Sequence, residues 1–239
     1  MLLRRPLRTP VLAAVALLTT VALGAKRDNH DLPEKYRKSP YTSMSLSVGA
    51  PSNGWQLRAK RLRSSGHLFI KENSRGHVYG HPALVLMLER SAKQMARDAA
   101  GSRLLVGDLS SEYGGPLPKH HSHQSGRDAD VGFFVTDPKG RAQEADHFVA
   151  FDKQGMARDG SGYRFDDYRN WLLVQLWMKD TRAKIMHVFV ASHLRRRLLD
   201  FASARPAFRG YVEQASTFLA QPGNSSAHDD HFHLRIDVK

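Results

Sequence analysis

His120-His-Ser-His-Gln-Ser-Gly-Arg-Asp-Ala-Asp130 and His228-Asp-Asp-His-Phe-His233 are the two stretches around which this chain of 239 residues is organised. Six of its 13 histidines fall within these two windows, far from an even scatter. Imidazole and carboxylate are zinc ligands, and a catalytic zinc site takes three of them and leaves one position open. A His and an Asp from the first window and a His from the second would supply that set. We therefore expect the rest of the chain to be the scaffold that brings the two windows together.

Each window lies at the junction of a predicted loop and a predicted strand. On a strand, residues i and i+2 face the same side, roughly 6–7 Å apart. His231 and His233 are therefore expected to point the same way, and Asp128 and Asp130 share this relation. A glycine before Asp130 lets the chain turn back, so that His123 and Asp130 converge. One imidazole of the C-terminal pair could then bind a metal while the other stands beside it.

A zinc ion held in this way polarises a carbonyl oxygen and lowers the pKa of its water to about 7, the two tasks that peptide hydrolysis requires. A nearby imidazole must then accept the water proton and pass it to the leaving amine. His231 or His228 could do this, and His120 could orient the intermediate.

The pattern along the chain predicts an α+β fold. Helices are expected at 82–100, 165–180 and 192–203, and strands at 104–108, 131–135, 185–190 and 231–238. Strands or a hairpin are expected over 55–71, around a turn at 64–66. Because helices and strands alternate irregularly, without a Gly-rich phosphate motif or a repeat, we expect one domain. Its central sheet should be mixed or antiparallel and flanked by helices.

The N-terminal region is predicted to direct export. Residues 1–25 carry three arginines, an apolar run and small residues before Lys26, which is the order of a secretory signal peptide; an uncleaved anchor is the alternative. Residues 26–50 are polar and without a sustained period, and predict a flexible mature N-terminus. The metallopeptidase domain is then expected over 51–239, in the periplasm. The chain has no cysteine, which excludes a disulfide, a lipid anchor on Cys and any thiolate mechanism.

The formal net charge of +13 falls to +10 when the three arginines of the predicted signal peptide are removed. Such a charge attracts polyanions generally. For an exported protein the cell wall is the expected partner, and the absence of a recognition motif argues against nucleic acid. We expect no stable membrane insertion once the signal is removed, and the oligomeric state stays open.

A family resemblance is carried by His123-Gln-Ser-Gly-Arg-Asp-Ala-Asp130 and by residues 228–233. It extends to Tyr113-Gly-Gly-Pro-Leu117 and to Phe165-Asp-Asp-Tyr-Arg-Asn-Trp171, so it spans most of residues 50–239. In these motifs the chain resembles the penicillin-insensitive murein endopeptidases, which belong with lysostaphin and the D-Ala-D-Ala peptidases to one group of zinc peptidases.

The resemblance implies His231 as the catalytic base, with His120 and His228 lining the site. It implies Zn²⁺ held by three ligands: His123, Asp130 and His233. The implied substrate is the peptidoglycan cross-link from D-alanine to meso-diaminopimelate, cut without a serine nucleophile. His and Asp ligands also accept other divalent ions, so the metal itself stays open.

Two alternatives remain at this point. Asp128 takes the place of an alanine in the related carboxypeptidases, and residues 228–231 replace their Glu-containing element. Both features favour the endopeptidase branch over a D,D- or L,D-carboxypeptidase. A non-catalytic, zinc-stabilised wall-binding module would be expected if the base were missing, but His231 is present. Whether Asp128, Asp229 and Asp230 orient ligands or only cap turns and solvate loops is open. The other histidines are expected to be ordinary surface or core residues: His30, His67, His77, His81, His121, His147, His187 and His193.

Overall fold

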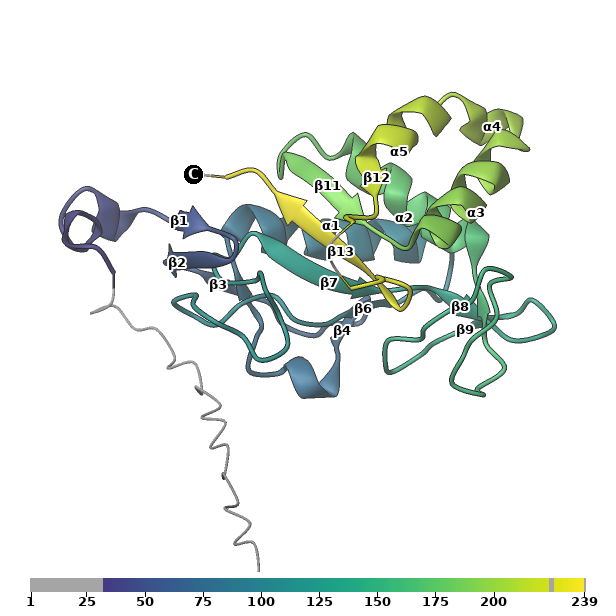
Figure 1. The fold of residues 1–239 in the computed structure, drawn as a ribbon, viewed down its shortest axis with the longest axis horizontal. Coiled ribbons are helices and arrows are strands. Elements are labelled where there is room, and N and C mark those ends of the chain that lie inside the picture. Colours follow the sequence, from purple (N-terminus) through teal and green to yellow (C-terminus); the bar gives the residue numbers. More distant parts are fainter. Residues whose placement is uncertain (1–31, 224–225, 239) are drawn as a thin grey trace, which may run out of the picture.

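A mixed six-stranded sheet forms the centre of the computed structural model, which describes residues 32–223 and 226–238 (Figure 1). The predicted signal peptide therefore lies outside the described residues. The strand order is β12-β11-β13-β7-β6-β4. The β4–β6 and β11–β12 pairs are parallel and the other pairs antiparallel, which confirms an α+β fold with a mixed sheet. In chain order the strands are β4 (Leu68–Ile70), β6 (Leu104–Val106), β7 (Asp128–Gly132), β11 (Ile185–Phe189), β12 (Leu219–Ala220) and β13 (His231–Ile236).

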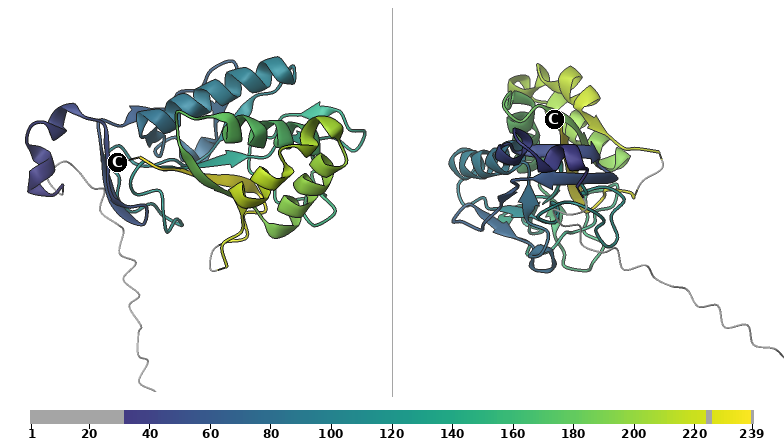
Figure 2. Two further views of the ribbon diagram at one scale, coloured as in Figure 1. Left: turned by 90° about the horizontal axis from the view of Figure 1, so that it is seen from above. Right: turned by 90° about the vertical axis from the view of Figure 1, so that its left-hand side faces the viewer.

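Helices α1 and α2 lie side by side behind this sheet in Figure 1, and α3 to α5 gather near β11 and β12 (Figures 1 and 2). Trp177 of α2 meets Phe232 of β13 edge to face, with ring centroids 5.4 Å apart, and both side chains are buried. None of the described helices is both long and apolar enough to cross a membrane. The helices are α1 (Pro82–Asp98), α2 (Asp167–Lys179), α3 (Ser192–Ser203), α4 (Pro206–Arg209) and α5 (Val212–Phe218).

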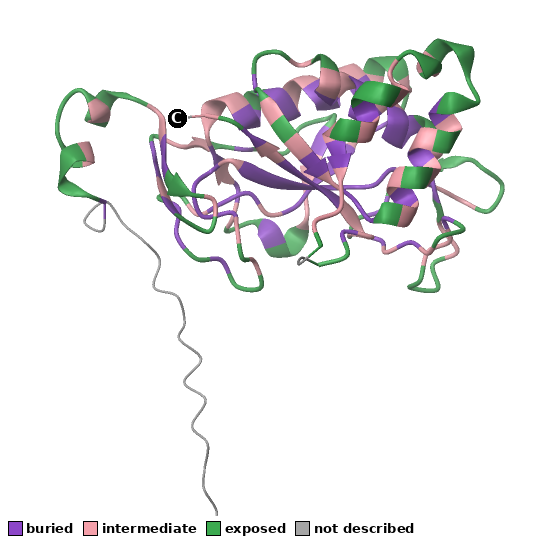
Figure 3. Ribbon diagram, turned by 45° about the horizontal axis from the view of Figure 1, so that its top comes forward, coloured by how far each residue is buried: buried purple, intermediate pink, exposed green. Residues whose placement is uncertain are grey.

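Smaller sheets surround the central one. They comprise β1 (Leu46–Ala50) with β2 (Asn53–Leu57), β3 (Lys60–Arg61) with β5 (Tyr79–Gly80), and β8 (Val135–Thr136) between β9 (Ala142–Gln143) and β10 (Arg164–Phe165). Three short 3₁₀ helices cover Glu34–Arg37, Tyr41–Ser43 and Glu72–Ser74. Figure 3 shows that buried residues concentrate on the central strands and on one side of the helices that cover them.

The three predicted helices are confirmed within two residues at each end, because their end signals are local. Pro82 is the first residue of α1, and the side chain of His81 accepts a hydrogen bond from the Ala83 N–H at 3.2 Å. The Asp166 side chain caps α2 in the same way, by accepting from the Arg169 N–H at 3.0 Å. Short elements within 206–220 were not predicted, because four- to seven-residue helices carry too little periodicity.

Of the two alternatives predicted within 55–71, the strands are confirmed and the hairpin is not. Residues 53–57 pair instead with β1, and Leu68–Ile70 pairs in parallel with Leu104–Val106. These partners come from outside the segment, so its alternating pattern could not identify them. The structure also places strand β1 in the segment 26–50 that the sequence predicted to be flexible, and buries Leu32 there.

The motif at 165–171 ties α2 to the end of β7. Asn170 donates from Nδ2 to the Phe134 carbonyl and accepts at Oδ1 from the Phe134 N–H, both at 2.9 Å. The buried Arg169 guanidinium donates to Asp166 at 2.6 Å and to the Val135 carbonyl. Two side chains of one helix thereby satisfy backbone groups of Phe134, which follows β7, and of Val135, which begins β8, and so fix this segment relative to α2.

Candidate metal centre

Strands β7 and β13 alternate between an apolar and a polar side. Phe232 and Leu234 are fully buried among core residues, so His231 and His233 face the other side of the sheet. His233 pairs with Asp130 across the two strands, and Arg235 pairs with Asp128. The expected i, i+2 relations are thus present on both strands, and the antiparallel register places the two windows next to each other.

The Oδ1 atom of Asp130 lies at the middle of three imidazoles. It is 3.3 Å from Nε2 of His123, 3.2 Å from Nδ1 of His233 and 3.4 Å from Nε2 of His231. Asp130 and His123 are almost fully buried, with exposed fractions of 1% and 0%. The structure therefore brings together all three residues predicted as metal ligands, with the predicted base beside them.

In two of the imidazoles, the ring nitrogen that points away from Asp130 is held by a hydrogen bond. His123 donates from Nδ1 to the Leu109 carbonyl at 2.7 Å, and because a carbonyl only accepts, Nε2 of His123 is left as a bare acceptor. Nε2 of His233 lies 3.0 Å from Oδ1 of Asp128, which leaves Nδ1 of His233 facing Asp130. Hydrogen bonds of this kind orient metal-binding histidines in proteins.

Among the described residues, Nε2 of His123 and Oδ1 of Asp130 have no hydrogen-bond partner. In the neutral form of His123 these are two buried acceptors 3.3 Å apart, which repel unless a cation lies between them. A divalent cation satisfies both, and nitrogen and carboxylate oxygen are ligands that zinc accepts. The residues present therefore fit a metal ion.

His120 approaches the same carboxylate from its other oxygen. The ligand atoms of His120, His123 and Asp130 all lie within 4.8 Å of one another, so these residues form a group able to hold a metal. Nδ1 of His120 is 3.8 Å from Oδ2 of Asp130, and its Nε2 is 3.0 Å from Oδ2 of Asp108. Oδ1 of Asp108 in turn lies 3.2 Å from Nδ1 of His77.

Asp108 was missed by the sequence reasoning, and His77 was expected to be an ordinary residue. A polar residue at the end of the predicted strand 104–108 was the available signal, because strand ends deliver side chains to the edge of a sheet. The structure shows that Asp108 lines the cavity and links His120 to His77, which lies behind it.

His231 and His228 complete the cluster. Nδ1 of His231 lies 2.6 Å from Oδ1 of Asp230, and its ring stacks on Phe148 at 4.9 Å with an interplanar angle of 24°. The His228 ring centroid is 5.5 Å from those of both His231 and His233. The predicted residues His120 and His228 therefore also line the site.

The pKa values follow from this crowding. Burial alone would raise the pKa of the Asp130 carboxyl, but His123 and His231 outweigh it and hold that pKa well below 3.8. Burial would lower the pKa of His231, but Asp130 and then Asp230 raise it to about 10. Burial, with repulsion from His231 and His233, lowers the pKa of His228 to about 4. His228 is therefore neutral at pH 7.

The three aspartates whose roles the sequence left open have different partners. Asp128 accepts from Nε of Arg235 at 2.6 Å in addition to its contact with His233. Asp230 contacts His231, as described above. Asp229 instead accepts from Arg158 at 2.7 Å. Asp128 and Asp230 thus orient site histidines, and Asp229 ties its loop to a neighbouring one.

The loops that carry the histidines have unusual backbone geometry. His123 and His228 have φ angles of 67° and 50°, in the left-handed region that costs energy for residues other than glycine. Gly126 has φ 72°, and a Cβ there would come within 1.9 Å of Oε1 of Gln56. Such geometry persists only where the surrounding structure holds it, which is common at functional sites.

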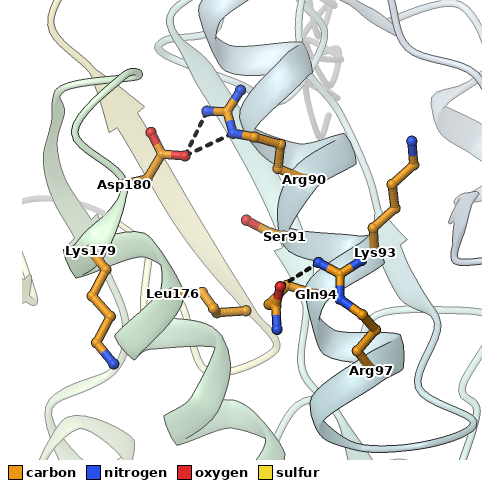
Figure 4. Close-up of a pocket in the computed structure, with 8 residues that line it drawn as sticks. All are labelled: Arg90, Ser91, Lys93, Gln94, Arg97, Leu176, Lys179 and Asp180. Carbon is orange, nitrogen blue, oxygen red and sulfur yellow. Dashed lines mark hydrogen bonds and ion pairs between the residues drawn. The ribbon is translucent and has the colours of Figure 1, made fainter.

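A cavity of about 800 Å³ opens over the cluster, and its wall includes His120, His228, His231 and His233. A hollow of about 430 Å³ adjoins it and shares Lys71, Phe148 and Asp230 with it. A separate groove of about 300 Å³ lies between α1 and α2 (Figure 4). That groove contains the Arg90–Asp180 ion pair at 2.6 Å and no histidine, so the chemistry belongs to the first cavity.

Comparison with known proteins agrees with this geometry. The family model described as penicillin-insensitive murein endopeptidase matches residues 47–239. A penicillin-insensitive murein endopeptidase of Haemophilus influenzae is 29% identical over 197 residues, which are 79% of this chain and 62% of that protein. Another from Escherichia coli O1:K1 / APEC is 30% identical over 149 residues, which are 62% of this chain and 53% of that protein. The matched part thus spans less than two thirds of either relative. The chain belongs to the penicillin-insensitive murein endopeptidase family.

Proposed function

We propose that this protein is an exported, zinc-dependent endopeptidase that hydrolyses the D-alanyl–meso-diaminopimelate cross-links of peptidoglycan. The observation that carries the proposal is the position of Asp130. Its Oδ1 atom lies within 3.4 Å of three imidazole nitrogens, and it and Nε2 of His123 are buried without a hydrogen-bond partner. The relatives' names supply the substrate class, murein.

The proposed ligands are Nε2 of His123, the Asp130 carboxylate and Nδ1 of His233. His120 competes with His233 for the third place. We favour His233 because its ligating nitrogen is 3.2 Å from Oδ1 of Asp130, the atom that His123 also faces, whereas His120 is 3.8 Å from the other oxygen. Asp128 supports this choice by holding the far nitrogen of His233.

When bound, zinc supplies Lewis-acid chemistry, because it polarises a carbonyl oxygen and lowers the pKa of a coordinated water to about 7. His231 is the proposed base, which accepts the proton of the attacking water at Nε2 and donates it to the leaving amine. Asp230 fixes the ring from the other nitrogen. Once Asp130 shares its charge with a cation, the attraction that keeps His231 protonated weakens, and the neutral form becomes available.

His228 and His120 are assigned to the reacting carbonyl group. The low pKa of His228, about 4, keeps it neutral, so it can donate one hydrogen bond without adding charge next to His231. His120 is oriented by Asp108, which lies 3.0 Å from its Nε2. We propose that both side chains orient the tetrahedral intermediate.

An endopeptidase needs a cleft that accepts chain on both sides of the scissile bond. The cavity over the cluster, of about 800 Å³, borders a hollow of about 430 Å³ with which it shares Lys71, Phe148 and Asp230. Space on more than one side of the histidine cluster favours an endopeptidase over a carboxypeptidase, whose site would need to close around a chain end.

The proposed location is the periplasm. It rests on residues 1–25, whose charge and apolar pattern are those of a signal peptide, and on the substrate, which lies outside the cytoplasm. The residues from 51 onward would form the metallopeptidase domain, preceded by the mature N-terminal segment 26–50.

Digestion of purified, cross-linked peptidoglycan by the chain without residues 1–25 tests the proposal, with fragments identified by mass spectrometry. A His231→Ala variant and a chelated sample, the latter also after zinc is restored, are run beside it. We expect cross-linked dimers to disappear, and both controls to prevent this. Release of single D-alanines would show a carboxypeptidase instead. Stoichiometric zinc binding without any cleavage would show a wall-binding module.

A further inference from the structure

The charged residues of the catalytic cavity are unequally paired. Its three carboxylates, Asp108, Asp130 and Asp230, each contact a histidine. Among its cations, Arg235 donates to Asp128 at 2.6 Å. Lys71 and the exposed Lys119, in contrast, form no ion pair with any described residue; of these two, Lys71 also lines the adjoining hollow. It is therefore a cation in the substrate cleft that is available to an anion.

Lys71 belongs to an ordered wall. Its backbone N–H donates to the Val106 carbonyl at 2.8 Å, which extends the pairing of β4 with β6. Its ammonium lies 5.3 Å from the centroid of the Phe148 ring, within the range of a cation–π contact. Phe148 stacks in turn on His231. Lys71 therefore stands one aromatic ring away from the proposed base.

Gly107 makes room for this wall. A Cβ at this position would come within 2.3 Å of Cζ of Phe148 and 3.4 Å of Cε of Lys71. Because Gly107 has no side chain, Phe148 can lie flat beside His231, and Lys71 can lie against the Phe148 ring.

The nearby acidic groups already have partners. Glu72 lies 3.2 Å from Arg75, and Asp146 lies 2.7 Å from Nδ1 of His147. Asp230 contacts His231 at 2.6 Å. On this side of the cleft, Lys71 is thus the described cation that no neighbouring carboxylate neutralises, and an incoming carboxylate would meet it without displacing an existing ion pair.

The proposed substrate carries such a group. In a D-alanyl–meso-diaminopimelate cross-link, the carbon that bears the scissile amide nitrogen also bears a carboxylate. His231 is the group proposed to protonate the leaving amine, so the amine side of the substrate lies beside His231. The next cation on that side is Lys71.

We propose that the Lys71 ammonium binds the carboxylate on the amine side of the scissile bond and so selects a cross-link to a diamino acid with a free carboxyl group. This inference rests on the proposed function, since it assigns a specificity-determining residue to the same site. A charge-assisted hydrogen bond of this kind gives about a tenfold preference in kcat/KM for the acid.

The test compares two cross-linked peptides that are identical except that this carboxylate is a carboxamide in one of them. The zinc-loaded wild type should cleave the acid about tenfold more efficiently. Lys71→Gln should cleave both at the rate at which the wild type cleaves the amide, and Lys71→Arg should restore part of the preference. Lys93→Gln is the matched control, because it makes the same change in the groove between α1 and α2 (Figure 4). Thermal unfolding verifies that each variant is folded.

Binding of the same two peptides, measured by calorimetry, separates this inference from the proposed function. Preferential binding of the acid without cleavage, lost in Lys71→Gln, would overturn the endopeptidase activity but support the role of Lys71. Equal binding and cleavage of both peptides by the wild type would overturn the role of Lys71. A preference for the acid peptide that persists in Lys71→Gln would also overturn it.

Discussion

Asp130 and His233 lie directly opposite each other on antiparallel strands β7 and β13, with Oδ1 of Asp130 3.2 Å from Nδ1 of His233. Asp128 holds the other ring nitrogen of His233, and Nε2 of His123 faces the same Asp130 oxygen at 3.3 Å. Two residues that are 103 positions apart in the chain thus become adjacent through strand register alone.

The choice between His233 and His120 as third metal ligand is testable by metal content. His233→Ala is expected to lose stoichiometric zinc, whereas His120→Ala should keep it with reduced activity, because His120 is proposed to orient the intermediate. Zinc is measured by elemental analysis after gel filtration, and the melting temperature verifies folding. Loss of zinc in His120→Ala, with retention in His233→Ala, would instead support the group of His120, His123 and Asp130.

Removal of the base should separate catalysis from metal binding. His231→Ala is expected to bind zinc like the wild type but to lose about 10²- to 10⁴-fold in kcat, the usual contribution of a positioned acid or base. Steady-state cleavage of a cross-linked peptide gives kcat, and competition with a chelator gives the zinc affinity. A fall in zinc affinity without a matching loss of kcat at saturating zinc would identify His231 as a ligand.

Asp128 is expected to act through His233. Asp128→Asn should lower zinc affinity or activity by roughly 10- to 100-fold, because the second hydrogen bond of a metal-binding histidine sets its orientation and basicity. Asp229→Asn is the matched control, since Asp229 contacts Arg158 and no histidine of the site. Equal losses in both variants would show that the effect is general to this region and not specific to His233.

The metal-free protein should become less stable between pH 6.5 and 4, in part because of His187. Burial, with repulsion from Arg235 and His233, lowers the pKa of His187 to about 4 from an ordinary value of 6.5. Below pH 6.5 His187 is therefore protonated in the unfolded chain but still neutral in the folded chain. The contribution of His187 to the free energy of unfolding is complete above pH 6.5 and is lost as the pH falls to 4. Because the His187 ring is only partly buried, we expect this loss of unfolding free energy to be about 1–2 kcal/mol.

Chemical denaturation at pH 7 and pH 4.5 measures this effect. A His187→Phe variant, which can keep the stacking contact of 4.1 Å with Phe189, should lose less stability over this range than the wild type. An identical loss in both proteins would show that His187 does not contribute.

The apolar side of β13 should dominate its stability. Phe232 is fully buried and packs edge to face on Phe133 and Trp177. Phe232→Ala is expected to cost about 3–5 kcal/mol of unfolding free energy, the range for deletion of a buried aromatic ring. Urea denaturation of the metal-free protein measures this cost. A cost below 1 kcal/mol would mean that the neighbouring side chains close the space.

The sequence by itself determined the elements with strong local signals. Pro82 and Asp166 mark the starts of α1 and α2, and the alternation His231-Phe232-His233 predicts a strand with one polar and one apolar side. These signals suffice because helix caps and strand periodicity depend on residues only a few positions apart. They also placed Asp130 and His233, two of the three predicted ligands, on one side of their strands.

Only the tertiary structure decided which strands pair and what surrounds the ligands. Strand 68–70 pairs in parallel with 104–106 and not within a hairpin, and the sequence could not decide between these because pairing between distant segments leaves no local pattern. The same sheet brings Lys71 and Asp108 to the cavity, and a separate loop brings Phe148, although none lies in either histidine window. The chemical types of the central residues could be recognised in the sequence, but their anchors and the cation beside the base depend on contacts that exist only in the folded chain.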